Sequence, residues 1–423
     1  MPAPEPSSIH RIVILGAGFG GIYAYRRLHW RLHGRTDVSV TIVNRENYFL
    51  FTPLLHEVAT GSIAPPNIVE SVRKIARCCV GDVVIGSVQR VRLEDRIVET
   101  DAGSLPYDEL IIALGSETNF YDTPGTEEHA LQLKSLSDAV RLKNHCLRLF
   151  EQAASETTNP EERRQLLRFV IVGGGPTGVE LAAELSEFVY GTLEAFFRRE
   201  DLLPEVDIVL LQAGSELLPQ FAPHSRTKSL EVLRQKKIRV CLDTTARTMD
   251  TEGVTLENGT PLPSKTVVWV AGTRPTPLAF DADVKRDTSG KLLVDTSLRL
   301  IGHKNVFALG DQAACLDAKT GRPLPGLAQV ATQQARIAAD NACAALHGKP
   351  LRTFRYRHKG NLASLGQWMA IAEIGGRHFW GHLAWWLWRT VYLTKFISRK
   401  KKFEIAMDWT LNLFASRDIS RIE

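Results

Sequence analysis

The chain has 423 residues, which is enough for two or three domains. Apolar residues make up 44% and charged residues 23%, values ordinary for globular proteins, so a disordered, collagen-like or multi-span membrane protein is excluded. The formal net charge is only +5.

The start of the chain, Met1 to Ser8, has neither a charged n-region nor an apolar h-region, so no secretory signal is expected. It also lacks the Arg-rich amphipathic pattern of a transit peptide. The six cysteines form no C-x-x-C pair, so we expect neither a zinc knuckle nor a thioredoxin-type redox pair, and no metal. Nor does any stretch reach the ~18 uncharged apolar residues of a membrane span. We therefore expect an intracellular protein.

A glycine-rich turn follows the first apolar strand. Residues 11–15 form a β-branched run, and it ends in the segment Gly16 to Gly21. A helical stretch from about residue 22 to 33 comes next, and then a second strand, 38–43. This order of strand, glycine turn, helix and strand is the context in which G-x-G-x-x-G indicates a dinucleotide site.

The same pattern returns 157 residues later, at Gly173 to Gly178. It follows the strand 169–172 and precedes a helical stretch from 179 to about 196 and a strand at 206–211. In each copy one glycine makes a tight turn, one lets the backbone approach a pyrophosphate, and one lets helix and strand pack closely. The glycines in these three places are Gly16, Gly18 and Gly21 in the first copy and Gly173, Gly175 and Gly178 in the second.

Each copy continues in the same way. Short antiparallel strands within 88–99 lead into an apolar strand at 107–116, and a hairpin at 254–259 leads into one at 266–274. A repeat of this size predicts two dinucleotide-binding domains in one chain. Between the copies, residues 131–167 are predicted to be helical with a polar break at 155–162.

The C-terminal residues 377–423 carry the whole excess of positive charge. They hold nine of the Lys and Arg residues against four acids, and five of the eight tryptophans. Tryptophan with basic residues favours a membrane interface. Beyond Phe403 the polar residues Glu404, Asp408 and Asn412 form one helical stripe beside Ile405, Trp409 and Leu413, which predicts a helix lying in the interface plane. Alternatives are a dimer interface built from the same aromatics and, less favoured because the tail is so apolar, a nucleic-acid site.

From Ile12 to about Ile419 the chain resembles the type II NADH:quinone dehydrogenases, single-subunit and non-proton-pumping members of the flavoprotein disulfide-reductase-like superfamily. The segments that carry the resemblance are Gly16–Gly21 (GAGFGG), Asn47–His56 (NYFLFTPLLH), Gly173–Glu180 (GGGPTGVE), Ala271–Arg274 (AGTR), Phe307–Asp311 (FALGD) and Gly326–Gln334 (GLAQVATQQ). It implies an α/β fold with two Rossmann-like domains, for FAD and NADH, and a C-terminal amphipathic helical membrane-anchoring region. The expected boundaries are 1–120 with 286–345 for FAD, 121–285 for NADH, and 346–423 for the C-terminal region.

The resemblance also implies site residues. Those expected to contact FAD are Gly16, Gly18, Phe19, Gly20, Gly21, Asn44, Gly115, Asp311, Ala328 and Gln329. Those expected to contact NADH are Gly173, Gly175, Pro176, Thr177, Gly178, Glu180, Gln212 and Gly272. Residues 48–53 would lie against the flavin, although such an aromatic cluster could equally be core.

Three side chains are expected to be catalytic. Glu180 is a proton-relay candidate, although the helix dipole alone would favour a carboxylate in a first helical turn. Gln329 and Gln333 lie four residues apart on a predicted helix, 328–345, and are expected to line the quinone site; otherwise they face water. A backbone role is also open there, since a helix N-terminus stabilises negative charge on a reduced ring. Asp311 could instead be a helix N-cap beside Gly310.

Two positions depart from the family pattern. An acid usually ends the second strand of each domain and binds a ribose hydroxyl, but here Asn44 and Gln212 stand in its place. An amide at Gln212 removes the repulsion of an NADPH phosphate, and no Lys or Arg follows until Arg226. We therefore expect NADH to be preferred, with NADPH a weaker substrate.

The expected function is non-electrogenic electron transfer from NADH through FAD to a membrane quinone. The expected partners are the quinone, the bilayer surface through residues 377–423 and a second copy of the chain. The expected location is the cytoplasmic face of the bacterial inner membrane, and less favoured is an organelle inner membrane. Alternatives are a sulfide:quinone oxidoreductase, for which Cys315 lacks an evident partner thiol, a disulfide reductase, and a non-catalytic nucleotide-sensing flavoprotein.

Overall fold

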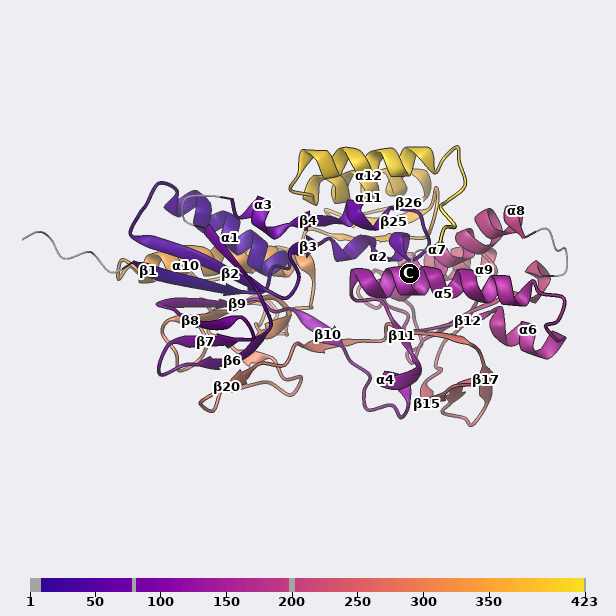
Figure 1. Ribbon diagram of the computed structural model, residues 1–423, viewed down its shortest axis with the longest axis horizontal. Coiled ribbons are helices and arrows are strands. Elements are labelled where there is room, and N and C mark those ends of the chain that lie inside the picture. Colours follow the sequence, from indigo (N-terminus) through magenta and orange to yellow (C-terminus); the bar gives the residue numbers. More distant parts are fainter. Residues whose placement is uncertain (1–8, 78–80, 198–201, 422–423) are drawn as a thin grey trace, which may run out of the picture. The chain divides into compact units, whose positions relative to one another are not determined.

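The computed structural model describes residues 9–77, 81–197 and 202–421. The chain forms two compact units, each assembled from three segments (Figure 1). Unit 1 consists of residues 1–49, 70–117 and 273–358, and unit 2 of residues 50–69, 118–272 and 359–423. The chain start, Met1 to Ser8, and the cysteines Cys78 and Cys79 lie outside the described residues.

These boundaries differ from the expected ones at three places. The segment 50–69, expected in the FAD domain, belongs to unit 2, and residues 273–285, expected in the NADH domain, belong to unit 1. A separate C-terminal region was expected at 346–423, but residues 346–358 belong to unit 1 and residues 359–423 to unit 2. The physical reason is burial, because Trp385, Trp388 and Trp409 are almost completely covered and need a partner surface within the unit.

Unit 1 is built on a five-stranded parallel sheet in the order β22-β9-β1-β2-β5. Its strands are β1 (His10–Leu15), β2 (Val38–Asn44), β5 (Gly81–Ile85), β9 (Glu109–Ile112) and β22 (Val306–Ala308). The inner strands β1 and β9 are buried along most of their length, as expected for parallel strands covered on both faces, whereas the edge strand β5 is mostly half-buried. The meander predicted after the first glycine turn is confirmed as β6 (Val88–Arg92), β7 (Ile97–Thr100) and β8 (Gly103–Pro106), with β20 (Ala279–Phe280) at its edge.

Two long helices of unit 1 pack on each other, α1 (Phe19–Leu32) and α10 (Ala328–Ala345). Small residues on α10, among them Ala335, Ala338 and Ala342, are fully buried. The packed pair is also joined by charge, since the buried Asp340 accepts hydrogen bonds from Arg27 and Arg31 of α1. The bounds of α10 agree with the predicted helix.

Unit 2 repeats this architecture with a parallel sheet in the order β11-β18-β12-β13-β14. The strands are β11 (Leu131–Gln132), β12 (Arg168–Val172), β13 (Asp207–Leu211), β14 (Ile238–Cys241) and β18 (Thr266–Trp269). A second meander consists of β15 (Ala246–Asp250), β16 (Gly253–Leu256) and β17 (Pro261–Pro263). Four strands of each sheet correspond in order, β9-β1-β2-β5 and β18-β12-β13-β14, which confirms the internal repeat, whereas the edge strands β22 and β11 come from different places in the chain.

Two helices of unit 2, α5 and α6, begin at side-chain caps. The segment predicted to be helical with a break forms α5 (Leu136–Ala153) and α6 (Pro160–Leu166). Ser135 and Asp138 make a capping box before α5, and Asn159 caps α6 ahead of Pro160. The helix after the second glycine turn is α7 (Pro176–Glu187), which continues as a π-helix (Phe188–Leu193) and α8 (Glu194–Phe196). Helix α9 (Pro223–Gln235) follows β13.

The C-terminal part of unit 2 starts with the antiparallel strands β24 (Asn361–Ser364), β25 (Ala370–Ile374) and β26 (Arg377–Trp380). Two neighbouring helices follow, α11 (Gly381–Lys395) and α12 (Arg399–Leu411) (Figure 1). They belong to the same unit as the short helix α2 (Leu55–Val58). Across the described part of the chain, no helix combines the length and apolarity needed to cross a bilayer.

Candidate nucleotide sites and a buried acid cluster

The two glycine turns have the same internal geometry. A Cβ at Gly21 would lie 1.8 Å from the Gly16 carbonyl oxygen, and one at Gly178 would lie 1.9 Å from that of Gly173. These glycines are therefore required by the protein's own backbone. By contrast, a Cβ at Gly18 would meet no atom within 4 Å. The space above Gly18 is open, which is the arrangement a pyrophosphate approaching the backbone requires.

Gly175 repeats this feature, since a Cβ there would also meet nothing within 4 Å. Both open glycines stand at the N-cap of their helix, and neither helix has a side-chain cap or an acid in its first turn. The N–H groups at these helix ends are thus available to an anion. Gly20 has a packing role instead, because a Cβ there would collide with Leu309.

Asn44 and Gln212, the two residues that depart from the family pattern, lie at the ends of the equivalent strands β2 and β13 and make equivalent hydrogen bonds. The Asn44 Oδ1 accepts from the Ala17 N–H at 2.8 Å, and the Gln212 Oε1 accepts from the Gly174 N–H at 2.9 Å. Each amide therefore braces its own glycine turn. The Gln212 Nε2 donates to the Glu216 carbonyl at 3.2 Å.

The remaining expected FAD residues of unit 1 lie near the ends of β9 and β22. Asp311 sits in a single 3-10 turn, Gly310–Gln312, and its Oδ2 accepts from the Ser116 hydroxyl at 2.5 Å. The suggestion that Asp311 caps a helix is wrong, since α10 begins at residue 328 behind Leu327. Gly115 has a φ of +72°, which favours glycine there.

Unit 1 fits a dinucleotide such as FAD. Among the residues that the structure describes, the buried Oε1 of Gln312 has no hydrogen-bond partner, although its Nε2 donates to the Gly115 carbonyl at 2.7 Å. Ala328 is the first residue of α10, whose N-terminus also lacks a side-chain cap. Phe19, at the start of α1, packs edge to face on Phe49 with ring centroids 5.2 Å apart.

The three glutamines of α10 differ in what they bind. The Gln333 amide donates to the Arg357 carbonyl at 3.0 Å and accepts from the Arg357 N–H at 3.1 Å, so it anchors that segment. It is therefore not a side chain that simply faces water. Gln329 lies one turn earlier and is partly exposed. Gln334 was not predicted as a site residue; it is buried, and its Oε1 accepts from the Gly310 N–H at 2.7 Å.

Unit 2 carries a cleft of about 460 Å³ at the carboxyl ends of its strands. Its lining includes Gly173, Gly174, Gly175, Gln212, Tyr121, Trp269 and Ala271. The volume suits a ligand of nucleotide size. Gly272 lies beside this cleft, and a Cβ there would collide with the Tyr121 hydroxyl. Pro176 and Thr177 form the start of α7.

Glu180 is the fifth residue of α7, so it lies beyond the first turn, and the helix-dipole explanation for a carboxylate at this place is wrong. Its side chain is buried. The Oε1 accepts from the Ser364 N–H at 2.9 Å, and the Oε2 lies 3.8 Å from the Nδ1 of His56. Burial raises the pKa of Glu180 to about 8, so this carboxyl group is largely protonated at neutral pH.

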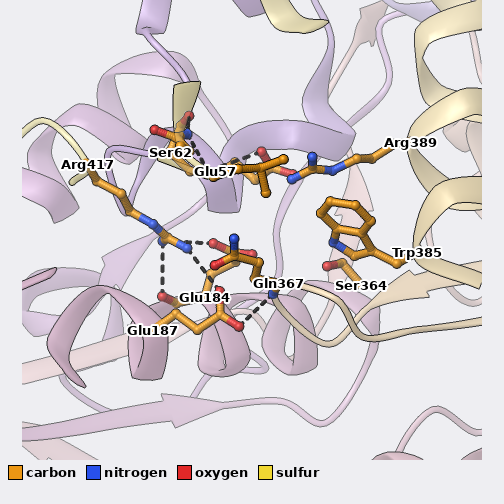
Figure 2. A pocket seen from close by; sticks show the side chains of 11 residues that line it. Glu57, Ser62, Glu184, Glu187, Ser364, Gln367, Trp385, Arg389 and Arg417 are labelled. Carbon is orange, nitrogen blue, oxygen red and sulfur yellow. Dashed lines mark hydrogen bonds and ion pairs between the residues drawn. The ribbon is translucent and has the colours of Figure 1, made fainter. Parts of the chain in front are cut away.

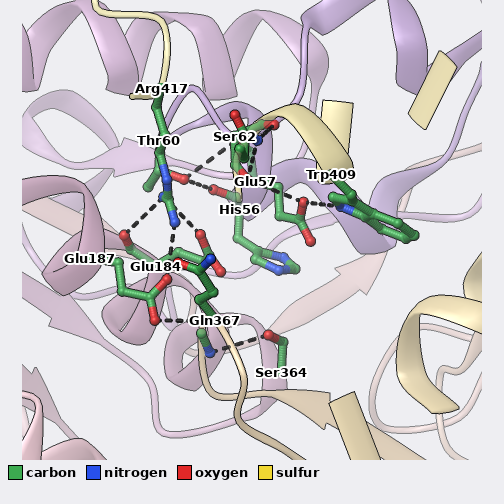
Figure 3. Close-up of polar contacts among 12 residues, drawn as sticks. His56, Glu57, Thr60, Ser62, Glu184, Glu187, Ser364, Gln367, Trp409 and Arg417 are labelled. Carbon is green, nitrogen blue, oxygen red and sulfur yellow. Dashed lines mark hydrogen bonds and ion pairs between the residues drawn. The ribbon is translucent and has the colours of Figure 1, made fainter. Parts of the chain in front are cut away.

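Glu180 belongs to a larger acid cluster that the sequence analysis missed. Glu57 of α2 and Glu184 and Glu187 of α7 lie in the same buried region, together with Arg417 from the segment after α12 (Figures 2 and 3). Spacing gives a partial signal, because Glu180, Glu184 and Glu187 are three or four residues apart and share a helix face. No local sequence pattern could have predicted that Glu57 lies beside these three residues, because Glu57 precedes Glu180 by 123 residues in the chain.

The thiols offer little support for the sulfide-oxidising alternative. Cys146, Cys241, Cys315 and Cys343, the cysteines that the structure describes, are all free. Burial raises the pKa of the Cys315 thiol, which disfavours a nucleophilic thiolate.

Two parallel sheets with glycine turns of matching geometry define the class of two-nucleotide oxidoreductases. Residues 10–335 match the family model for pyridine nucleotide-disulphide oxidoreductases, and residues 358–418 match that of the NDH2 C-terminal domain. The chain is 32% identical to a type II NADH:quinone oxidoreductase, Ndh, of Mycobacterium tuberculosis, covering 98% of this chain and 90% of that protein. The chain belongs to the type II NADH:quinone oxidoreductases.

Further relatives agree with this assignment. The demethylphylloquinone reductase NdbB of Synechocystis is 33% identical, with 94% of this chain and 95% of that protein covered. Among solved structures, the NDH2 of Plasmodium falciparum in complex with NADH superposes with a TM-score of 0.90 at 22% identity, covering 97% of this chain and 100% of that one. A sulfide:quinone oxidoreductase of Aquifex aeolicus has the lower TM-score of 0.71 at 17% identity.

The two kinds of glycine predict opposite phenotypes in unit 1. Gly18→Ala should leave the free energy of unfolding of the FAD-free protein within about 0.5 kcal/mol of the parent's value, because the added Cβ meets no protein atom within 4 Å. It should nevertheless weaken FAD binding, measured by flavin fluorescence. Gly21→Ala should lower stability by several kcal/mol in urea unfolding, because its Cβ would enter the Gly16 carbonyl. Equal effects of the two substitutions on both readouts would contradict this assignment.

Proposed function

We propose that this chain oxidises NADH and reduces a membrane quinone, with FAD held by unit 1 and NADH by unit 2. The observation that carries the proposal is the pair of open glycine turns, Gly18 and Gly175, in a chain of this family. FAD, when bound, supplies the capacity to take two electrons from NADH and pass them to quinone. The protein supplies binding, orientation and protons.

In unit 1, the backbone around Gly18 and the N-terminus of α1 would bind the FAD pyrophosphate, and Asp311 would bind its ribityl side. The N-terminus of α10, at Ala328, would favour negative charge on the flavin ring through the helix dipole. Gln329 would line the quinone site. Gln333 would contribute there mainly by fixing the Arg357 backbone, since its amide is already bonded.

In unit 2, the backbone of Gly173 to Gly178 would bind the NADH pyrophosphate, and Gln212 would face the adenosine ribose. Glu180 would hold a proton near the nicotinamide. Formation of quinol from quinone and NADH consumes one proton in addition to the transferred hydride, so a protonated carboxyl group has a defined use in the reaction.

An anaerobic stopped-flow experiment tests both half-reactions. FAD-loaded protein mixed with NADH should lose its flavin absorbance, and a second mix with a short-chain quinone should restore it rapidly. Bleaching by sulfide but not by NADH would assign the enzyme to the sulfide-oxidising alternative. If neither reductant bleaches the flavin, the chain is a binding protein and the proposal is wrong.

Nucleotide preference follows from the environment of Gln212. Both ends of its amide are bonded within the protein, and Arg226, the next basic residue, is held by Glu216 and by the Phe221 and Pro219 carbonyls. Among the described residues that line this cleft there is no Lys or Arg to bind a 2′-phosphate. We expect kcat/KM to favour NADH by roughly tenfold, and Gln212→Asp to widen the ratio by roughly another tenfold. Equal kcat/KM values for the two nucleotides in the parent enzyme would contradict this.

We further propose that α11 and α12 bind the bilayer surface, which makes the protein a peripheral membrane protein of the cytoplasmic face. The exposed side of α12 carries Phe403, Met407 and Leu411 at helical spacing, with exposed fractions of 67%, 40% and 54%. Leu383 and Trp386 of α11 are also exposed. Helix α12 begins with four consecutive basic residues, 399–402. The helix dipole disfavours cations at a helix N-terminus, so these side chains do not stabilise the helix itself. Attraction to anionic lipid headgroups would account for their position.

Two residues of the polar stripe of this helix face the protein. Asp408 accepts from the Asn67 amide at 2.7 Å, and Asn412 donates to Ser62. Ile405 and Trp409 are buried beside these contacts, and the apolar residues left outside are Phe403, Met407 and Leu411. Deletion of 377–423 would therefore also remove buried tryptophans from unit 2, and point substitutions are the better test.

The triple substitution of Phe403, Met407 and Leu411 to Gln should reduce binding to vesicles containing anionic lipid by roughly 100-fold, at about 1 kcal/mol for each partly buried side chain. Flotation measures the bound fraction. Exposed Trp30 and Ile301 of unit 1 provide the control, since their substitution to Gln should change nothing. If the triple variant instead binds vesicles normally and loses self-association in ultracentrifugation, the surface is a homodimer interface.

A further inference from the structure

Unit 1 carries a cleft of about 420 Å³ at the edge of its sheet opposite to the glycine turn. Its lining includes His10 and Glu109, the first residues of β1 and β9, and Asn305, which directly precedes β22. The cleft therefore lies at the amino ends of these parallel strands, whereas the turn from Gly16 to Gly21 follows the carboxyl end of β1. Because β1 has six residues, roughly 16 Å separates its two ends, so this cleft is distinct from the proposed FAD site.

The wall of this cleft is rich in cations. The basic side chains that line it are Arg96, Arg299, Lys304 and Lys349. They come from three separate places in the chain, ahead of β7, ahead of β22 and beyond the end of α10, so tertiary packing gathers them. Like charges repel one another, and a cleft lined mainly by one sign of charge concentrates its field on ions of the opposite sign.

The protein itself does little to neutralise these cations. The cleft has two carboxyl groups, Asp108 and Glu109. The Asp108 Oδ2 accepts from the Arg11 N–H at 2.7 Å, so this carboxyl group is bonded to the backbone of β1. Among the residues that the structure describes, no ion pair involves Arg96, Lys304 or Lys349. These charges are therefore left to attract an external anion.

Three buried polar atoms in the same cleft also point to a ligand. Within the described part of the chain, the Glu109 Oε2, the His10 Nε2 and the Arg299 Nε have no hydrogen-bond partner. The Glu109 residue is only 6% exposed. A buried polar atom without a hydrogen bond is costly and therefore rare in folded proteins. Three of them around one cleft are explained by a single ligand that bonds to all three.

The carboxyl group of Glu109 does not oppose an anion at neutral pH. Burial raises its pKa to about 8, although the nearby Arg299 and Arg96 act in the opposite direction. The group is therefore largely protonated at pH 7 and presents an O–H donor to the cleft. Burial also lowers the pKa of His10, so its imidazole is neutral there and can donate or accept one hydrogen bond.

A metal ion does not fit this lining. The basic side chains would repel a cation, and among the described residues no group of three or more His, Cys, Asp or Glu side chains could hold a metal ion. The donors that converge here are guanidinium, ammonium and O–H groups. They match a ligand with several oxygen acceptors and more than one negative charge, which is the chemistry of a phosphate group.

We propose that this cleft of unit 1 binds a small molecule that carries a phosphate group. The Arg299 guanidinium and the Glu109 carboxyl group bond to the phosphate oxygens, and Lys304 and Lys349 add positive charge at the exposed side of the cleft. The volume lies in the range of small-molecule sites, so there is room for an organic part beyond the phosphate itself. The inference concerns unit 1 alone and does not rest on the proposed function.

The test is a calorimetric titration of the FAD-loaded enzyme with inorganic phosphate and, separately, with glucose 6-phosphate. An ionic strength of about 0.15 M screens attraction to scattered surface charges. We expect saturable binding of both probes. Tighter binding of the ester supports a ligand with an organic part, and equal affinities support recognition of the phosphate group alone. If neither probe binds saturably, the inference is overturned.

The double variant Lys304→Gln, Lys349→Gln locates the bound phosphate. Both lysines are exposed, so their loss should not disturb the core, and phosphate binding should weaken by roughly tenfold. The matched control is Lys285→Gln, Lys319→Gln, which removes two exposed lysines of unit 1 that do not line this cleft. Its affinity should stay within about twofold of the parent. Equal weakening in the two variants would overturn the inference, because overall charge would then explain the binding.

Two single variants test the buried donors. Arg299→Lys keeps the charge but loses the planar fork of N–H donors, so phosphate affinity should fall by roughly tenfold. Glu109→Gln should leave the affinity at pH 7 within about threefold, because Gln is neutral like the protonated acid. A tenfold loss in Glu109→Gln would contradict the inference, since an ionised carboxylate would then be a binding group, as in a cation site. Parent affinity in Arg299→Lys and in the double lysine variant would place the phosphate elsewhere and overturn the inference. Neither half-reaction enters this test, so its failure leaves the proposed function intact.

Discussion

The organisation of both units depends on one close approach, that of a helix backbone to the turn preceding it. At Gly21 and Gly178 the helix passes so near a carbonyl oxygen of the glycine turn that no side chain fits. This contact sets the direction of α1 and α7 and leaves their N-terminal N–H groups beside an open surface. The nucleotide sites are thus consequences of backbone packing, and side chains such as Asn44 and Gln212 only brace them.

The acid cluster of unit 2 follows a different constraint. Two carboxylates on a buried helix face require cations, and the chain supplies one from its C-terminal segment, Arg417. This explains why the C-terminal residues are part of unit 2 and not a separate appendage. Glu57 and Glu180 accept hydrogen bonds from the neutral donors Trp409 and Ser364, and burial raises the pKa of both carboxyl groups.

Much of the fold could be predicted from local patterns. The glycine turns, the meanders and helix α10 follow from spacing and from β-branched runs that act over a few residues. The acid cluster could not be predicted, since Glu57, Glu180 and Arg417 meet only through tertiary packing. The side of α12 that faces the protein could not be predicted, for a related reason. Periodicity identifies a stripe, but which stripe turns inward depends on partners such as Asn67 and Ser62, which are more than 300 residues away in the chain.

The orientation of α12 has a consequence for the whole C-terminal segment. Its outer face exposes apolar side chains beside basic ones, while its inner face delivers Trp409 to Glu57, and the chain continues directly to Arg417. The surface proposed to meet the bilayer and the groups that set the charge of the acid cluster therefore belong to one short stretch of about twenty residues. Loss of the Arg417 contact would leave the Glu184 carboxylate buried without its cation, which costs several kcal/mol. That cost holds the C-terminal segment against the rest of unit 2.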